Sequence, residues 1–341
     1  MRNYATEIAK MKKGEFSPVY LFLGKESYFN QEARETLLNF SMEEADKELN
    51  VGIYNMEEVP LGSALEDAES MPFFGERRLV IVENPYFLTG EKNKSNLDHD
   101  LEWLEGYLNH PSESTILVFF APYEKLDNRK KISKTLKKKA MTVDVSALDS
   151  NETRKFLNGF IKNQGYQMER NTLQFFFEKI EDNLSRGMQE LEKLFLAALE
   201  DKNITRKMVQ DLVAHTLEQN IFELVTYVLK KDTERAIDIY RDLLLQKEEP
   251  IKINAILLGQ FRLLLQVKVL AKLGYQQPDM AKVLKVHPYR VKLANQQVRN
   301  LSETILQNAY TGLVETERNL KTGAGLREVQ FEMFMLKYAE I

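Results

Sequence analysis

The first 145 residues alternate between short apolar runs and stretches that favour helix, and this alternation constrains the fold more than any other feature. The runs are VYLFL (19–23), VGIY (51–54), RLVIV (78–82), TILVFF (115–120) and MTVDV (141–145), and the helical stretches lie near 28–40, 61–69, 98–109 and 128–139. Apolar runs without clean alternation are typical of parallel strands buried on both faces. The pattern therefore predicts a three-layer α/β domain over residues 1–145.

The pattern changes after residue 145. Asp149 precedes Glu152 by three residues, which is the spacing of a capping box, and Gly165 is placed to end the helix that follows. Ser41 and Glu44 have the same capping-box spacing in the first domain. Further helical patterns predict a small all-helical unit over residues 146–214. From about residue 217 the chain stays helical, which predicts a larger helical domain over 215–341.

Composition excludes several kinds of site. The chain has no cysteine, so it can form no disulfide and no thiolate zinc site, and its four histidines lack the spacing of metal ligands. We therefore expect no metal or other cofactor. The net charge of −4 argues against a chain that is a basic nucleic-acid binder as a whole. Residues 216–341 carry +3 and the remainder −7, which permits a local basic face.

The sequence alone suggests neither a signal peptide nor a membrane-spanning segment. The N-terminal segment MRNYATEIAKMKKGEF has no apolar core of the signal-peptide type. The longest uninterrupted apolar run is Ile116 to Ala121, and no segment approaches the ~20 residues needed to cross a bilayer. We expect a soluble cytoplasmic protein with no membrane partner.

The first apolar run ends at Gly24, and Lys25-Glu26-Ser27 leads into a helix, which is where an ATPase places its phosphate loop. That loop needs a glycine five residues before its Gly-Lys pair and a Ser or Thr after it. Val19 and Glu26 occupy those two positions. The third run ends in Glu83-Asn84 rather than in an acidic pair for a metal. The alternative reading, a turn that needs glycine for backbone geometry, is favoured; Arg186 is likewise read as a solvated helix residue rather than a phosphate sensor.

The sequence resembles the delta subunits of the bacterial DNA polymerase III clamp loader over essentially its whole length. The similarity rests on VYLFLGKESYF, MPFFGERRLVIVEN, DNRKKISKTLKKKAMTVDV, ELEKLFL, QFRLLLQVKVLAKLG and ERNLKTGAG, in this order. The resemblance implies an AAA+-like α/β domain (1–145), a helical lid (146–214) and a helical collar that assembles with other subunits (215–341). It also implies a non-catalytic subunit that binds the ring-shaped sliding clamp and favours its opening without hydrolysing ATP.

The resemblance assigns clamp binding to Met71, Pro72, Phe73 and Phe74. Phe73 and Phe74 match the two hydrophobic positions that enter a pocket on the clamp, and Gly75 lets the chain turn into the next strand. Without the resemblance, two phenylalanines beside a strand are more often core residues. Pro72 and Gly75 favour an exposed loop instead.

A second candidate is the basic run from Lys125 to Lys139. Lys130, Lys134 and Lys138 share one face if this segment is helical, so they could contact DNA phosphates. A solvated helix face is an equally good interpretation. Few aromatic residues lie among these lysines, which argues against specific reading of single strands.

Three functions compete. The favoured one is a clamp-loader subunit whose partners are the sliding clamp, the other loader subunits (delta prime and tau/gamma) and, weakly, primer-template DNA. The second is an active AAA+ ATPase, which the turn at Gly24 and Lys25 disfavours. The third is a sequence-specific nucleic-acid protein, which the acidic balance and the lack of a recognition motif disfavour.

Overall fold

The structure is a computed structural model that describes residues 4–73, 75–90, 97–214, 217–286 and 288–340. The chain divides into two compact units, Met1–Val213 and Ala214–Ile341. This division lies beside the expected limit of the third domain at 214/215.

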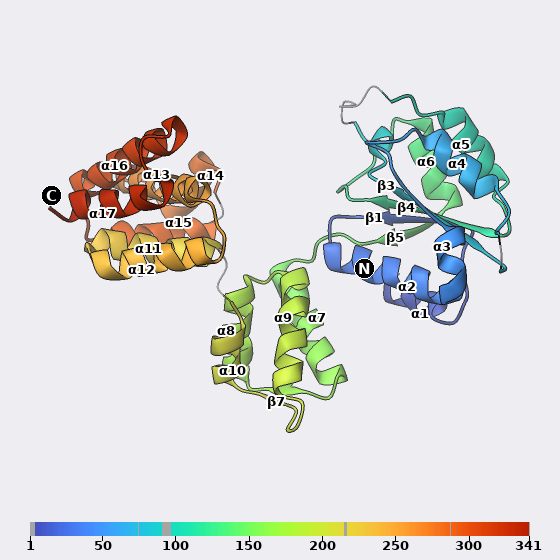
Figure 1. Ribbon diagram of the computed structural model, residues 1–341, viewed down its shortest axis with the longest axis horizontal. Helices are drawn as coiled ribbons and strands as arrows, with labels where there is room; N and C mark the ends of the chain where they lie inside the picture. Colours follow the sequence, from blue (N-terminus) through green and yellow to red (C-terminus); the bar gives the residue numbers. More distant parts are fainter. Residues whose placement is uncertain (1–3, 74, 91–96, 215–216, 287, 341) are drawn as a thin grey trace. The chain divides into compact units, whose positions relative to one another are not determined.

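The first unit is built on a five-stranded parallel sheet (Figure 1). Its strands are β1 (Val19–Leu23), β2 (Val51–Asn55), β3 (Arg78–Glu83), β4 (Thr115–Ala121) and β5 (Met141–Asp144). They lie in the order β2-β3-β4-β1-β5, and every neighbouring pair is parallel. The five apolar runs of the sequence are therefore the five strands, as predicted.

Helices cover both faces of the sheet. Alternate residues of one strand pack into different cores: Tyr20 and Phe22 face the cluster that includes α1 and α2, whereas Val19 and Leu21 face the cluster that includes α4, α5 and α6. This explains why the strands are apolar throughout. The helices are α1 (Tyr4–Met11), α2 (Ser27–Phe40), α3 (Lys47–Asn50), α4 (Leu61–Glu69), α5 (Leu101–Asn109) and α6 (Lys131–Lys139), with short 3-10 turns η1 (Glu44–Asp46) and η2 (Tyr86–Leu88).

The capping box predicted at Ser41 and Glu44 is wrong. Ser41 ends α2 instead of starting a helix, because its backbone N–H donates to the Leu37 carbonyl of the last turn. The residue before η1 is Glu43, which makes no side-chain cap. The second capping box is confirmed: Asp149 and Glu152 exchange both bonds at the start of α7.

The rest of the first unit contains α7 (Ser150–Asn163), α8 (Arg170–Ile180), α9 (Leu184–Ala197) and α10 (Arg206–Leu212). It is not entirely helical, since β6 (Gln167–Met168) and β7 (Asn203–Ile204) form a short parallel pair that the sequence did not suggest. The core of these helices is continuous with the α1–α2 side of the sheet. The expected boundary at 145/146 falls in the link between β5 and α7 and stays a prediction.

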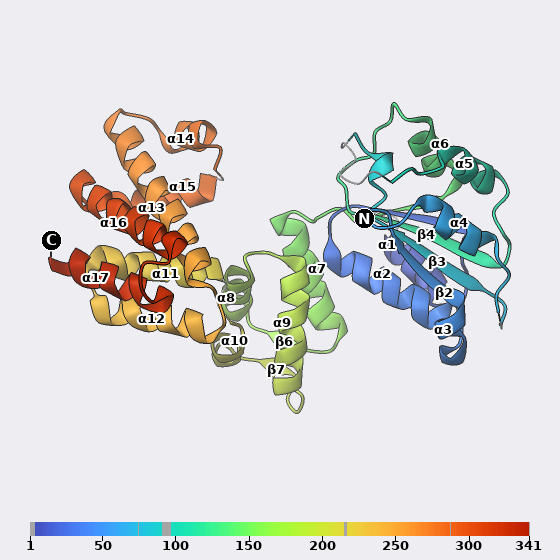
Figure 2. The same cartoon turned by 45° about the horizontal axis from the view of Figure 1, so that its top comes forward.

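The second unit is a bundle of seven helices within its described residues. They are α11 (Leu217–Lys230), α12 (Thr233–Leu245), α13 (Pro250–Lys272), α14 (Gln277–Leu284), α15 (Pro288–Val298), α16 (Glu303–Thr322) and α17 (Gln330–Glu340), with a 3-10 turn η3 (Arg327–Val329) before α17. Helix α13 runs through the middle of the bundle and contacts α11, α15 and α16 (Figure 2). Its buried stripe includes Leu257, Phe261 and Leu264.

Helix α13 corrects one expectation from the sequence. It has 23 residues, and a window of it reaches a mean hydropathy of 1.4, so by length and composition alone it is long and apolar enough to cross a membrane. In the sequence, Arg262 and Lys268 divide this helix into shorter apolar runs, so no long uninterrupted run is visible. The central helix of a soluble bundle passes the same test, and 44% of the window is buried against the other helices.

His99 ties two parts of the α4 side of the sheet together. Its Nδ1 accepts the N–H of Leu61, the first residue of α4, at 3.0 Å, and its Nε2 lies 2.6 Å from the Tyr86 hydroxyl. Burial lowers the pKa of His99 below its ordinary value. The folded protein therefore favours the neutral ring, whose Nδ1 can accept the bond.

Acidification should weaken the first unit through His99. The unfolded chain binds a proton that the folded chain resists, so the contribution is complete above the ordinary histidine pKa of about 6.5 and is lost as pH falls below it towards the lowered pKa of the folded state. Urea unfolding followed by the single tryptophan, Trp103 on α5, measures this. Between pH 7.5 and pH 5, wild type should lose more unfolding free energy than His99→Asn, which cannot titrate. Equal losses would contradict the assignment.

Candidate functional site

Met71–Phe73 and Gly75 lie between α4 and β3, and two of these residues carry exposed apolar side chains. Met71 is 86% exposed and Phe73 is 70% exposed, while Pro72 is half-buried. The structure thus places Met71 and Phe73 outside the core. Phe74 lies outside the described residues. We call Met71–Phe73 the tip.

The backbone of the tip is held by polar contacts at its base. The N–H of Phe73 donates to Oδ1 of Asn50 at 2.7 Å, and Asn50 is fully buried at the end of α3. Gly75 has a φ of +76°, and a Cβ there would lie 2.6 Å from the Asp46 carboxylate. Because left-handed backbone and close approach both favour glycine, the sequence signal at Gly75 has a direct structural cause.

A half-buried ion pair holds the other side of the base. Arg78, the first residue of β3, pairs with Asp67 of α4, and their side chains are only 15% and 10% exposed. Nη1 of Arg78 also donates to the Met71 carbonyl at 3.4 Å. Sequence reasoning missed Asn50, Asp67 and Arg78, because nothing in a single sequence links them to the tip.

Two more exposed apolar side chains come from the segment that holds the tip. Leu49, next to Asn50 in α3, is 48% exposed, and Ile53 of β2 is 52% exposed. β2 is one of the two edge strands of the sheet. The sequence offered no reason to single these two residues out.

The turn after β1 needs glycine for close backbone approach. Gly24 has a φ of +144°, and a Cβ there would lie 2.2 Å from the backbone of Val145. The N–H of Glu26 donates to the Val145 carbonyl at 3.0 Å, which joins this turn to the end of β5. The interpretation of Gly24 as a residue required by backbone geometry is confirmed.

The chain's own side chains occupy the N-terminus of α2. The N–H of Tyr28 lies 3.4 Å from Oε1 of Glu26 and 3.0 Å from Oγ of Ser185, a residue of α9. Ser185 donates its hydroxyl to Glu26 at 2.6 Å, so the Ser27 hydroxyl donates to Ser185 at 2.7 Å. A helix N-terminus commonly binds an anion. Here a carboxylate of the protein already takes that place.

Lys25 and Glu83, which the sequence analysis compared with the phosphate and metal ligands of an ATPase, have partners within the protein. Lys25 pairs with Glu124 at 3.2 Å on the surface. Glu83, at the end of β3, forms an ion pair with Arg34 of α2, whose guanidinium also lies over the Phe120 ring at 5.2 Å. Of this network, the sequence indicated Lys25, Glu26 and Glu83 but not Ser185 or Arg34. Arg186 follows Ser185 on α9 and is half-buried.

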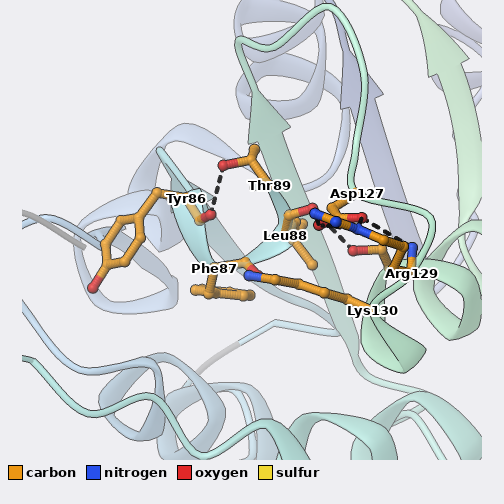
Figure 3. Close-up of polar contacts among 8 residues, drawn as sticks. Tyr86, Phe87, Leu88, Thr89, Asp127, Arg129 and Lys130 are labelled. Carbon is orange, nitrogen blue, oxygen red and sulfur yellow. Dashed lines mark hydrogen bonds and ion pairs between the residues drawn. The ribbon is translucent and has the colours of Figure 1, made fainter. Parts of the chain in front are cut away.

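The basic run is partly engaged within the fold. Figure 3 shows Lys130 beside Phe87, and its Nζ donates to the Phe87 carbonyl at 2.8 Å. Hydrogen bonds from Arg129 hold the pKa of Asp127 well below its usual range. Lys130 precedes the first turn of α6, whereas Lys134 and Lys138 lie on α6 and are exposed. The structure thus leaves two of the three predicted lysines on an open helix face.

Comparison with known proteins covers nearly the whole chain. The family described as DNA polymerase III, delta subunit, matches residues 20–146, and the one described as DNA polymerase III delta subunit, C-terminal domain, matches residues 218–338. The DNA polymerase III subunit delta of Bacillus subtilis is 42% identical over 327 residues, which are 96% of this chain and 94% of that protein.

The chain is also similar to solved structures. The Bacillus subtilis DNA clamp loader delta protein aligns with a TM-score of 0.71 and 40% identity, over 98% of this chain and 99% of that one. A gamma subunit-related protein of DNA polymerase III from Thermotoga maritima is 12% identical over 99% of both chains, with a TM-score of 0.36. The expected architecture, a parallel-sheet domain followed by helical parts, is confirmed, and the first of these structures shares it. The chain belongs to the family of DNA polymerase III delta subunits, which are clamp-loader components.

Proposed function

We propose that this delta subunit binds the sliding clamp through the tip and favours opening of the ring for loading onto primed DNA, without hydrolysing ATP. The observation that carries the proposal is the exposure of Met71 and Phe73 on a backbone that Asn50 holds in place. Exposed apolar side chains on a fixed backbone suit an apolar pocket on a partner, because little order has to be gained on binding. Phe74 is proposed to enter the same pocket.

The size of the expected contact is adequate. Aromatic side chains bury 150–250 Å² each, and a tip that buries about 300 Å² gains roughly 7 kcal/mol at ~25 cal/mol/Å², before the costs of association. Binding favours opening only if the open ring offers better contact than the closed one. We infer that a fixed tip fills the pocket while neighbouring surface of the first unit fits the open ring better.

The absence of hydrolysis is proposed from the turn after β1. Glu26 and Ser185 already satisfy the N-terminus of α2, and Glu83 is paired with Arg34. A phosphate at this position would meet the Glu26 carboxylate and would have to displace Ser185. Like charges at close range disfavour that exchange.

The proposed complex follows from family membership. We assign residues 215–341 to the collar that assembles with the other clamp-loader subunits, delta prime and tau/gamma, and residues 146–214 to the lid. Primer-template DNA is a weak partner through Lys134 and Lys138, which are exposed on α6. A subunit of this kind works in the cytoplasm.

The first prediction from this proposal concerns the tip. Met71→Ala with Phe73→Ala should weaken binding to purified sliding clamp by at least about 2 kcal/mol, roughly 30-fold in Kd, because interface anchors carry most of the affinity. Calorimetric titration without nucleotide measures this. Leu245→Ala with Leu326→Ala is the matched control, since these side chains are 80% and 72% exposed in the other unit.

The control variant should bind the clamp as tightly as wild type. Both variants should keep the wild-type melting temperature, because the replaced side chains are exposed. Wild-type affinity in the Met71/Phe73 variant would rule out the tip as the clamp-binding element.

The second prediction concerns nucleotide. Titration of the full chain with Mg-ATP should give no binding in the micromolar range, because the chain's own groups fill the phosphate position. An ATP-hydrolysing clamp-loader subunit, titrated in the same buffer, serves as the positive control. Micromolar affinity for this chain would revive the alternative of an active AAA+ ATPase.

The third prediction concerns α6. Lys134→Ala with Lys138→Ala should lower the slope of log Kd against log salt for primed DNA by about 1.8, because two phosphate contacts are lost. Lys162→Ala with Lys207→Ala removes the same charge from exposed positions on α7 and α10 and should leave the slope unchanged. Equal slopes in all three proteins would leave α6 as a solvated face.

A further inference from the structure

Helices α14 and α15 form a helix–turn–helix. Helix α14 spans eight residues (Gln277–Leu284), α15 spans eleven (Pro288–Val298), and three residues of sequence separate them. Lys285 ends α14 with a φ of +54°, the left-handed conformation that closes a helix sharply. A turn of three to four residues between two such helices is the arrangement found in DNA-binding helix–turn–helix proteins. His287, which lies between the two helices in the sequence, is outside the described residues.

One side of this pair is fixed to the bundle. Met280 and Ala281 of α14 and Val291, Ala294 and Val298 of α15 are buried. Helix α15 contacts both α14 and α13, so the pair rests on the central helix of the unit. The pair is therefore a built part of the fold, and its opposite side faces outward.

The outward side is basic and carries an exposed amide. Lys292 and Gln296 of α15 and Arg299, the residue after this helix, follow one another at helical spacing on the side opposite the buried residues, and all three are exposed. Lys282 of α14 adds a cation whose side chain is 80% exposed and lies 4.0 Å from the carboxylate of Asp279. Lys and Arg bind phosphates and guanine edges, and Gln binds adenine edges.

The charge of this segment departs from the rest of the chain. Residues 277–299 contain five Lys or Arg and one acidic residue, Asp279, which gives +4. The whole chain carries −4, so the remaining residues sum to −8. Excess positive charge in an otherwise acidic protein is the electrostatic footprint of a nucleic-acid surface.

We propose that α14 and α15 form a second DNA-binding surface, which binds duplex DNA with α15 towards the major groove. The groove is wide enough for one α-helix, and contacts to phosphates supply most of the affinity. Lys282, Lys292 and Arg299 contact phosphates, and Gln296 lies where a side chain reaches the base edges. This surface belongs to the second unit and is separate from the lysines of α6, so it does not depend on the proposed clamp binding.

The test compares two triple variants of the full chain by fluorescence anisotropy with a labelled blunt duplex of about 20 base pairs. Lys282→Ala, Lys292→Ala and Arg299→Ala should raise Kd at least about tenfold at 50 mM salt and lower the salt slope by about 2.7. The control variant Arg318→Ala, Lys321→Ala and Lys337→Ala also removes two lysines and one arginine, here from exposed positions on α16 and α17. This control should bind within twofold of wild type.

Several results would overturn the proposal. One is wild-type binding in the α14–α15 variant, and another is an equal loss in the control, which would show that only net charge matters. A third is that single-stranded DNA of the same length binds wild type as tightly as the duplex does, and that the α14–α15 substitutions weaken its binding equally. A melting temperature within a few degrees of wild type for both variants excludes unfolding as the cause.

Discussion

The hydrogen bond from the Phe73 N–H to the buried Asn50 side chain is the contact on which the tip depends. A buried amide that lost this partner would cost about 1–3 kcal/mol, so the fold holds the turn in one position. The Arg78–Asp67 pair fixes the same turn from the β3 side. Apolar side chains can then stay exposed without their backbone becoming mobile, and the order needed for binding is supplied during folding.

The turn after β1 is also held in place by contacts within the chain. There, too, contacts within the chain fix a loop between a strand and a helix, but they occupy the helix N-terminus instead of exposing side chains. Ser185 and Glu26 supply from within the chain what a phosphate supplies in an ATPase. The same bonds join α9 to the start of α2, so they also hold the α9 helix beside α2.

The local parts of this structure could be predicted, and the long-range parts could not. Strands buried on both faces need apolar residues throughout, so the five runs were visible, and the box at Asp149 and Glu152 is complete within four residues. Ser41 misleads because its three-residue spacing from Glu44 is that of a capping box, although this serine ends one helix and does not begin the next. Asn50 lies 23 residues from Phe73, and Ser185 lies 157 from Tyr28, so no local pattern connects them.

The most direct test of the tip is hydrogen exchange of the full chain with and without purified sliding clamp, in the absence of nucleotide. The account predicts that backbone amides of residues 70–76 exchange more slowly in the complex, while those of the turn at residues 24–28 stay as they are. Unchanged exchange at residues 70–76 under saturating clamp would contradict it, because the clamp would then be bound by another surface.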